Sequence, residues 1–135
     1  MNIAIVGTSD WTPPGQPVYD LVMRAIEDAP DTVDFYARKL KKFGVDELAL
    51  YYAAKLGYPV YALGPLDKSR PAVFTRDIAL VEAADKVYVL FRPGLENTGG
   101  TQHVVEKALD AKKAVEVYTL DGENRLVLLG SHDGG

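Results

Sequence analysis

The segment Lys86–Leu109, with the sequence KVYVLFRPGLENTGGTQHVVEKAL, does most to set the fold of this chain. Its first six residues are β-branched, aromatic or aliphatic, apart from the leading lysine, which is typical of a buried strand. Residues 92–100 contain one proline and three glycines, and so predict a loop. From Thr101 onward, apolar side chains recur at helical spacing. A strand, a loop and a helix in this order form part of a βαβ unit.

The same alternation continues on both sides of this segment. The expected strands cover residues 3–7, 33–37, 59–63, 86–91, 114–120 and 125–129, and the expected helices cover 18–29, 44–56, 74–84 and a segment beginning near 101. Asp121–Asn124 predicts a turn, so the last strand should return antiparallel at the sheet edge. The pattern favours a Rossmann-like three-layer α/β/α fold with a mainly parallel five-stranded sheet and a terminal antiparallel edge strand. We expect one domain over residues 1–130 and a loose tail over 131–135.

Length and composition agree with one small domain. The chain has 135 residues, of which 47% are hydrophobic, enough for a single core. No run approaches the roughly 18 consecutive apolar residues of a membrane span, and Met1–Val6 lacks the basic region of a secretory signal. We therefore expect a soluble, cytoplasmic protein with no membrane partner.

The residue types present also narrow the chemistry. The chain has no cysteine, and its two histidines, His103 and His132, are far apart in sequence, so we expect no metal site and no cofactor. The net charge of −4 argues against a general nucleic-acid coat, because such binding needs many lysines and arginines to neutralise phosphates.

Three groups of basic residues nevertheless follow predicted strands. They lie at Arg38–Lys42, at Lys68–Arg76 and at Arg92. Ligands of parallel α/β sheets bind beyond the carboxyl ends of the strands. A bound anion would explain why an acidic protein places positive charge there. For Arg38–Lys42 alone, a plain solvated loop explains the sequence equally well.

The strongest local signal for a ligand is the segment Asn97–Gln102, which contains Gly99, Gly100 and Thr101. Paired glycines let backbone approach a ligand closely, and the free N–H groups and positive dipole end of the following helix favour an anion. The alternative is an ordinary turn into a helix that Thr101 caps. The segment is not a P-loop, because no lysine follows the glycines.

Other loops offer weaker signals at the same predicted edge. Gly7 would admit a ligand closely, the hydroxyl groups after it would donate hydrogen bonds, and Trp11 would either stack on a base or pack against its own domain. Asp46 and Glu47 would serve a ribose or acid-base chemistry, or cap the helix that they begin. His103 is expected to be an exposed helix residue. The predicted nucleotide and phosphate ligands are Gly7, Thr8, Ser9, Gly44, Asp46, Arg76, Arg92, Gly99, Gly100 and Thr101.

These motifs together resemble the SLOG superfamily, which includes LOG-type phosphoribohydrolases, the DNA-processing protein DprA and small YspA-like proteins. Gly7-Thr8-Ser9 resembles its opening turn, and Gly44–Ala49 is similar to its Gly-x-Asp-x-x-Ala helix start. Arg76-Asp77 followed by Ala84–Val87, and Gly100-Thr101 followed by Lys112–Val115, resemble its later motifs. The resemblance covers nearly the whole chain and implies a nucleotide or nucleotide-derived ligand at the Gly-Thr loop.

The resemblance leaves open whether the protein is an enzyme. LOG-type enzymes have a catalytic glutamate three residues after the Gly-Thr pair, and this chain has Val104 there. Glu106 should face away from the site, because two residues are a rotation of roughly 200° around a helix. The second strand is also followed by basic residues where family members often have a glycine-rich turn.

Three hypotheses about function follow. The first is a nucleotide-binding or nucleotide-sensing protein without efficient chemistry. The second is an N-glycosidic hydrolase of the phosphoribohydrolase type, in which Glu47 or Asp46 replaces the missing glutamate and Arg76 holds a phosphate. The third is a DprA-like DNA-binding protein, against which the overall acidity counts. The resemblance also allows a homodimer formed through helices that flank the sheet.

Overall fold

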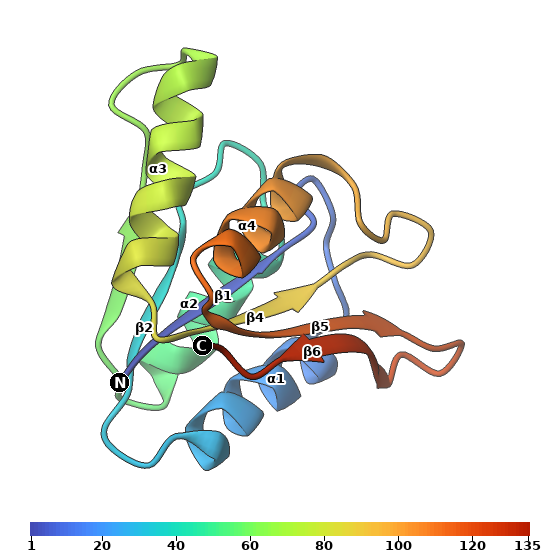
Figure 1. Ribbon diagram of the computed structural model, residues 1–135. Helices are drawn as coiled ribbons and strands as arrows, with labels where there is room; N and C mark the ends of the chain where they lie inside the picture. The colour runs from blue at the N-terminus through green and yellow to red at the C-terminus, as the bar shows by residue number, and fades with distance from the viewer.

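Strands and helices alternate along the chain in the computed structural model, which describes residues 1–135 (Figure 1). The strands are β1 (Asn2–Gly7), β2 (Asp34–Arg38), β3 (Val60–Leu63), β4 (Lys86–Leu90), β5 (Ala114–Leu120) and β6 (Leu126–His132). The helices are α1 (Gly15–Asp28), α2 (Val45–Lys55), α3 (Arg70–Ala83) and α4 (Gly99–Asp110). This confirms the α/β class that the sequence predicts.

One six-stranded, mostly parallel sheet runs through the molecule in the order β3-β2-β1-β4-β5-β6. β1 lies beside β4, with Ile3 paired to Lys86 and Gly7 to Leu90. β6 runs antiparallel to β5 at one edge. The chain moves outward from β1 to β3 and then returns to β4, so the order reverses between β1 and β4. In such sheets a crevice forms beyond the strand ends at this reversal.

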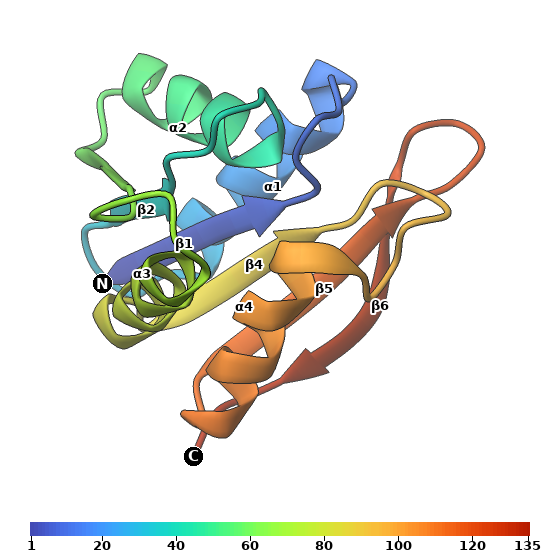
Figure 2. The ribbon, with the colours of Figure 1, turned by 90° about the horizontal axis from the view of Figure 1, so that it is seen from above.

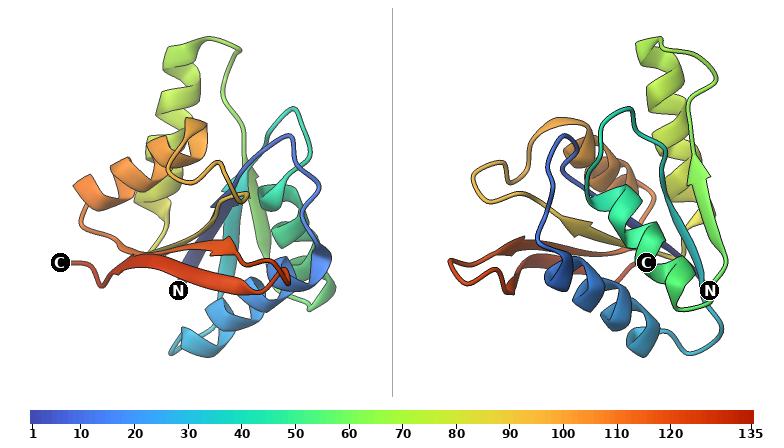
Figure 3. Two further views of the ribbon diagram at one scale, coloured as in Figure 1. Left: turned by 90° about the vertical axis from the view of Figure 1, so that its right-hand side faces the viewer. Right: turned by 180° about the vertical axis from the view of Figure 1, so that it is seen from behind.

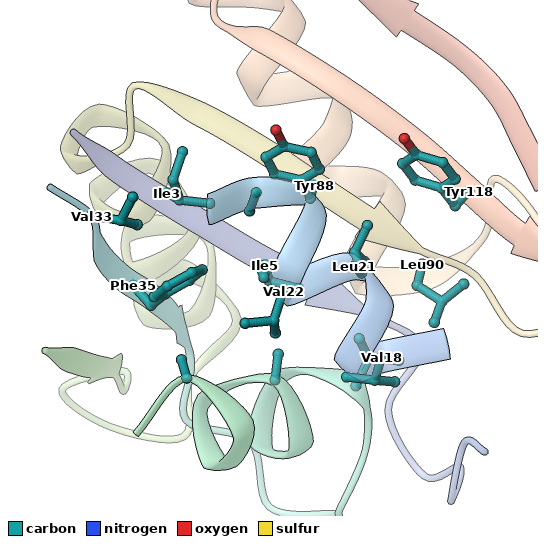
Figure 4. Close-up of a cluster of buried hydrophobic side chains, with 14 of the residues drawn as sticks. Ile3, Ile5, Val18, Leu21, Val22, Val33, Phe35, Tyr88, Leu90 and Tyr118 are labelled. Atoms are coloured by element: carbon teal, nitrogen blue, oxygen red, sulfur yellow. The ribbon is translucent and has the colours of Figure 1, made fainter. Parts of the chain in front are cut away.

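Helices cover both faces of the sheet, as the view from above shows (Figure 2). Successive side chains of a strand point to opposite faces, and β1 shows this clearly. Ile3 and Ile5 join a core cluster with α1 and α2, whereas Ala4 and Val6 join a second cluster with α3 and α4. In the first cluster, apolar side chains of α1 lie against the sheet (Figure 4). A strand with both faces buried explains the unbroken apolar run at the start of the chain.

Two helices begin earlier than their apolar pattern indicates. α1 begins at Gly15 and α3 at Arg70, three and four residues before the first periodic apolar side chain. At α3 the hydroxyl oxygen of Ser69 accepts a hydrogen bond from the N–H of Ala72. Such a cap and a polar first turn lie outside the hydrophobic pattern, and so the pattern misses them. None of the four helices has the length and apolar character needed to cross a membrane.

The C-terminal residues differ from the expected loose tail. β6 extends to His132 rather than ending near 129, and Ser131 and His132 pair with β5. The N–H of Gly135 also donates to the carbonyl of Lys112 at 2.9 Å. The physical reason is that β5 is seven residues long and would otherwise leave its outer N–H and C=O groups without partners.

Candidate functional site

The loops after β1, β2 and β4 lie together at one end of the sheet (Figure 3). Ser9 forms an isolated β-bridge with Gly44, and the N–H of Trp11 donates to the carbonyl of Phe43 at 3.2 Å. A hollow of about 330 Å³ lies among these loops and the start of α4. We call it the anion pocket. It is lined by Thr8, Ser9, Arg38, Leu40, Val73, Arg76, Asp77, Leu95, Thr98, Gly99, Gly100 and Thr101.

A buried ion pair forms one wall of the anion pocket. The side chains of Arg38 and Asp46 are only 4% and 1% exposed. Oδ2 of Asp46 accepts from the Arg38 backbone N–H at 3.0 Å and from Arg38 Nε at 2.9 Å. Oδ1 accepts from the Gly7 N–H at 3.0 Å and from Arg38 Nη2 at 2.9 Å. Burial lowers the pKa of Arg38, but Asp46 and, more weakly, Asp77 raise it by more than burial lowers it. The guanidinium therefore stays charged.

Arg38 also joins β1 to α4. Its Nη2 donates to the carbonyl of Gly7 at 2.8 Å and to the hydroxyl oxygen of Thr101 at 3.0 Å. The Thr101 hydroxyl donates in turn to the same Gly7 carbonyl at 2.8 Å. Thr101 is therefore buried and holds the start of α4 against the end of β1. Its single hydroxyl proton is already used within the protein.

A second charged cluster joins α3 to α4. Arg76 and Asp77 have side chains only 5% and 2% exposed, and Arg76 Nε donates to Asp77 Oδ1 at 2.7 Å. Asp77 Oδ2 lies 2.8 Å from Nδ1 of His103. Because an ionised carboxylate only accepts hydrogen bonds, Nδ1 carries the proton. The ring of His103 also lies 4.4 Å from that of Phe74, centroid to centroid. His103 is thus anchored between two helices and is not the exposed residue that the sequence suggested.

The first turn of α4 presents free donors to the anion pocket. The backbone N–H groups of Gly99, Gly100 and Thr101 make no hydrogen bond within the protein, and Thr98 provides no side-chain cap. Gly99 has φ of 70°, a conformation that favours glycine and turns the loop into the helix. Unpaired N–H groups and the positive dipole end of a helix attract anions.

Besides these N–H groups, each of the two arginines has one nitrogen that is free to donate a hydrogen bond. Arg38 Nη1 and Arg76 Nη2 have no hydrogen-bond partner in the protein. Neither atom is fully enclosed, because the only fully buried side-chain N or O atom without a partner is Oε1 of Gln102. Both side chains line the anion pocket, and Arg38 Nη1 lies 3.7 Å from the position that a Cβ atom at Gly100 would take. Two held guanidinium groups and three N–H groups can together bind a tetrahedral oxyanion.

Six of the predicted ligand residues line the anion pocket, and four do not. Gly99, Gly100, Thr101, Thr8, Ser9 and Arg76 line it. Asp46 is enclosed by Arg38, so it neither caps α2 nor faces a ligand. Arg92 is exposed and does not line the pocket, although its backbone N–H donates to the Thr8 hydroxyl oxygen at 2.9 Å.

The remaining two, Gly7 and Gly44, serve packing rather than approach by a ligand. A Cβ atom at Gly7 would lie 2.3 Å from the Leu90 carbonyl oxygen, and one at Gly44 would lie 2.6 Å from the Thr8 carbonyl oxygen. Both glycines therefore let neighbouring segments of the protein itself come close. Gly44 lines a different hollow of about 390 Å³, together with Glu47. Trp11 packs against the α1 side of the core, as its alternative interpretation predicted.

Three charged or titratable residues at or beside the anion pocket were not predicted from the sequence as ligands. Arg38 belongs to the basic segment that could equally have been a solvated loop, and it is instead the buried member of that segment. Asp77 was noted only as part of a motif, and His103 only as an exposed residue. The one signal available was spacing: His103 lies four residues after Gly99, so it shares the helix face that begins at the pocket.

Val104, at the position where LOG-type enzymes have their catalytic glutamate, lies in apolar surroundings. Val104 is fully buried in the cluster formed with α3 and the sheet. Glu106 is exposed, as its rotation around the helix predicted. The only carboxylate that lines the anion pocket is that of Asp77.

Comparison with known proteins assigns no family to the chain: no family model matches it, and no curated protein matches its sequence significantly. The SLOG resemblance therefore stays a prediction. What the protein does has to be inferred from the geometry of its site.

Proposed function

We propose that this protein binds a nucleotide or a nucleotide-derived ligand, with a phosphate group in the anion pocket. The observation that carries the proposal is that donors gather around one hollow: three unpaired N–H groups of α4, and the side chains of Arg38 and Arg76, each of which has one unpaired nitrogen. Both guanidinium groups are held by carboxylates, so they need little reorganisation to bind an anion. Preorganised donors of this kind bind phosphate strongly.

The rest of the pocket suits the non-phosphate part of such a ligand. Leu40, Val73 and Leu95 are the apolar residues of its lining, against which a base or sugar would lie. Its volume of about 330 Å³ is at the small end of ligand pockets, which span roughly 300–1,000 Å³. The strand order from β3 to β5 is that of a Rossmann-like sheet, and the pocket lies beyond the reversal between β1 and β4, where such sheets bind nucleotides.

The positions of the carboxylates favour a protein that binds the ligand without hydrolysing it. Asp46 already accepts four hydrogen bonds from the protein, and Glu47 lines a neighbouring hollow rather than the anion pocket itself. A hydrolase of the phosphoribohydrolase type would have to use Asp77 and His103 as its acid-base pair. Their contact at 2.8 Å beside the pocket is the one observation that keeps this second function in view.

Gly100→Asp tests the phosphate site. A Cβ atom at Gly100 would have only Arg38 Nη1 within 4 Å, at 3.7 Å, so the side chain fits and places its carboxylate where the phosphate should bind. We expect AMP binding, measured by calorimetry, to fall below detection. Gly122→Asp is the matched control, because it adds the same charge in the exposed turn after β5 where nothing lies within 4 Å. Unchanged AMP affinity in Gly100→Asp would show that the phosphate is bound elsewhere.

A second assay separates binding from chemistry. Wild-type protein is incubated with each of the common nucleoside 5′-monophosphates, and free base is measured by chromatography. We expect no release above the spontaneous rate. Release of free base that is lost in His103→Gln, with AMP affinity retained, would reject the binding protein in favour of the hydrolase.

A further inference from the structure

A second hollow, of about 400 Å³, adjoins the anion pocket and is strongly basic. We call it the lysine groove. It is lined by Ser9, Lys39, Leu40, Lys41, Lys42, Pro65, Lys68, Val73 and Arg76. Five of these nine residues are cationic and none is acidic. The groove is therefore locally positive, although the protein as a whole has a net charge of −4.

The lysine groove and the anion pocket are parts of one continuous depression. Ser9, Leu40, Val73 and Arg76 line both hollows. Arg76 lies between them: its Nε is bound to Asp77, while its Nη1 reaches toward the carbonyl of Lys39 at 3.4 Å. A ligand group bound in one hollow would therefore have its neighbouring group at the mouth of the other.

The two hollows differ in their charge balance. In the anion pocket, each arginine is offset by a buried carboxylate, Arg38 by Asp46 and Arg76 by Asp77. That pocket therefore offers well-placed donors with little net charge.

In the lysine groove most of the positive charge is not offset. Lys39, Lys41 and Lys68 form no ion pair, and Lys42 has only an exposed one with Asp10, with side chains 69% and 70% exposed. Cations that have no neighbouring carboxylate attract the negative charge of a ligand, including that of phosphates beyond the first one.

We infer that the ligand carries a chain of at least two phosphates and belongs to the nucleoside di- or triphosphates. This inference rests on the proposed function. One phosphate binds the first turn of α4 and the two arginines. The next phosphate binds the lysine groove, chiefly Lys39 after β2 and Lys68 after β3, which come from different loops and so enclose it from two sides. Selectivity between nucleotides of different phosphate number then comes from the groove, because its lysines act on the phosphates beyond the first.

The test compares probes of increasing phosphate number, without divalent cations, by calorimetry. Inorganic phosphate and AMP probe the anion pocket, and pyrophosphate, ADP and ATP probe both hollows. We expect pyrophosphate to bind at least about tenfold more tightly than phosphate, and ADP at least about tenfold more tightly than AMP, because two or more lysines act on the added charge. This gain should shrink as salt rises from 50 to 500 mM, since exposed charges are screened.

Lys39→Gln/Lys68→Gln removes two groove cations and leaves the anion pocket intact. We expect the double variant to lose most of the gain for pyrophosphate and ADP and to keep AMP affinity within about twofold. Lys55→Gln/Lys107→Gln is the matched control, because it removes two lysines from the last turns of α2 and α4, at the opposite end of those helices from the pocket. It should bind every probe as the wild type does.

The possible failures are distinguishable. If wild-type protein binds none of the probes, the proposed function itself is wrong. If phosphate and AMP bind but pyrophosphate and ADP bind no more tightly, the proposed function stands and the polyphosphate inference is overturned. Tight binding of a single-stranded oligonucleotide that ATP does not displace would also overturn it, and would assign the groove to nucleic acid.

Discussion

Replacing Asp46 by asparagine, which has nearly the same shape, should destabilise the protein more than any other isosteric substitution in the site. Each carboxylate oxygen accepts two hydrogen bonds, Oδ1 from Gly7 and Arg38 and Oδ2 from Arg38 twice. Whichever oxygen becomes an NH₂ group, a donor then faces two donors. The substitution also leaves the guanidinium of Arg38, which is 4% exposed, without its counter-charge.

The expected size of this effect follows from the burial of the pair. Removing one partner of a buried ion pair costs about 3–5 kcal/mol, because the other charge stays buried and uncompensated. A domain of this size has a free energy of unfolding of roughly 5–15 kcal/mol in total. With a urea dependence of about 1–3 kcal/mol per molar, the midpoint of unfolding should fall by at least about 1 M.

Urea unfolding at pH 7, followed by circular dichroism, measures the change. Asp10→Asn is the control, because it removes the carboxylate of the exposed pair with Lys42, which spans 3.2 Å, and exposed pairs contribute about 1 kcal/mol or less. Adding Arg38→Met to Asp46→Asn should recover part of the loss, since it removes the unpaired charge. If Asp46→Asn and Asp10→Asn shift the midpoint equally, the buried pair does not hold the site together and the reasoning is refuted.

Three further predictions concern stability. Gly7→Ala should cost at least about 1–3 kcal/mol in urea unfolding, because its Cβ would lie 2.3 Å from a carbonyl oxygen of β4, whereas Gly130→Ala, with nothing within 4 Å, should change little; equal effects would contradict the packing role. Thr101→Val should cost about 1–3 kcal/mol by the same measurement, since the hydroxyl bonds to the Gly7 carbonyl and to the buried guanidinium are lost, and a change near zero would count against this anchor. Burial raises the pKa of Glu116, but hydrogen bonds from Lys86 and a tyrosine lower it below its ordinary 4.5, so its contribution is complete above that pH and declines as pH falls below it. Glu116→Gln should therefore be less stable than wild type at pH 7 and should lose less stability between pH 5 and pH 3, and an unaltered pH profile would reject this assignment.

The class of fold and the approximate place of every strand and helix could be predicted from the amino-acid sequence alone. Hydrophobic periodicity is a local property, and each apolar run is long enough to specify its own element. The alternation of strands with helices then leaves few topologies, and one of these pairs β1 with β4, as the structure does. The Gly99–Thr101 segment could also be assigned to a pocket, because its donors belong to the backbone of one helix start.

Which side chains are free to bind a ligand could not be predicted in this way, because it depends on contacts between distant elements. Asp46 looks from the sequence like a cap or a catalytic carboxylate, and it is neither, because β2 places Arg38 against it. The Thr101 hydroxyl is used by Gly7, which lies 94 residues away along the chain. His103 meets Asp77 only because α3 and α4 lie side by side on one face of the sheet. Such pairings depend on the register and packing of distant elements, and the pattern of hydrophobic residues along the chain contains no information about either.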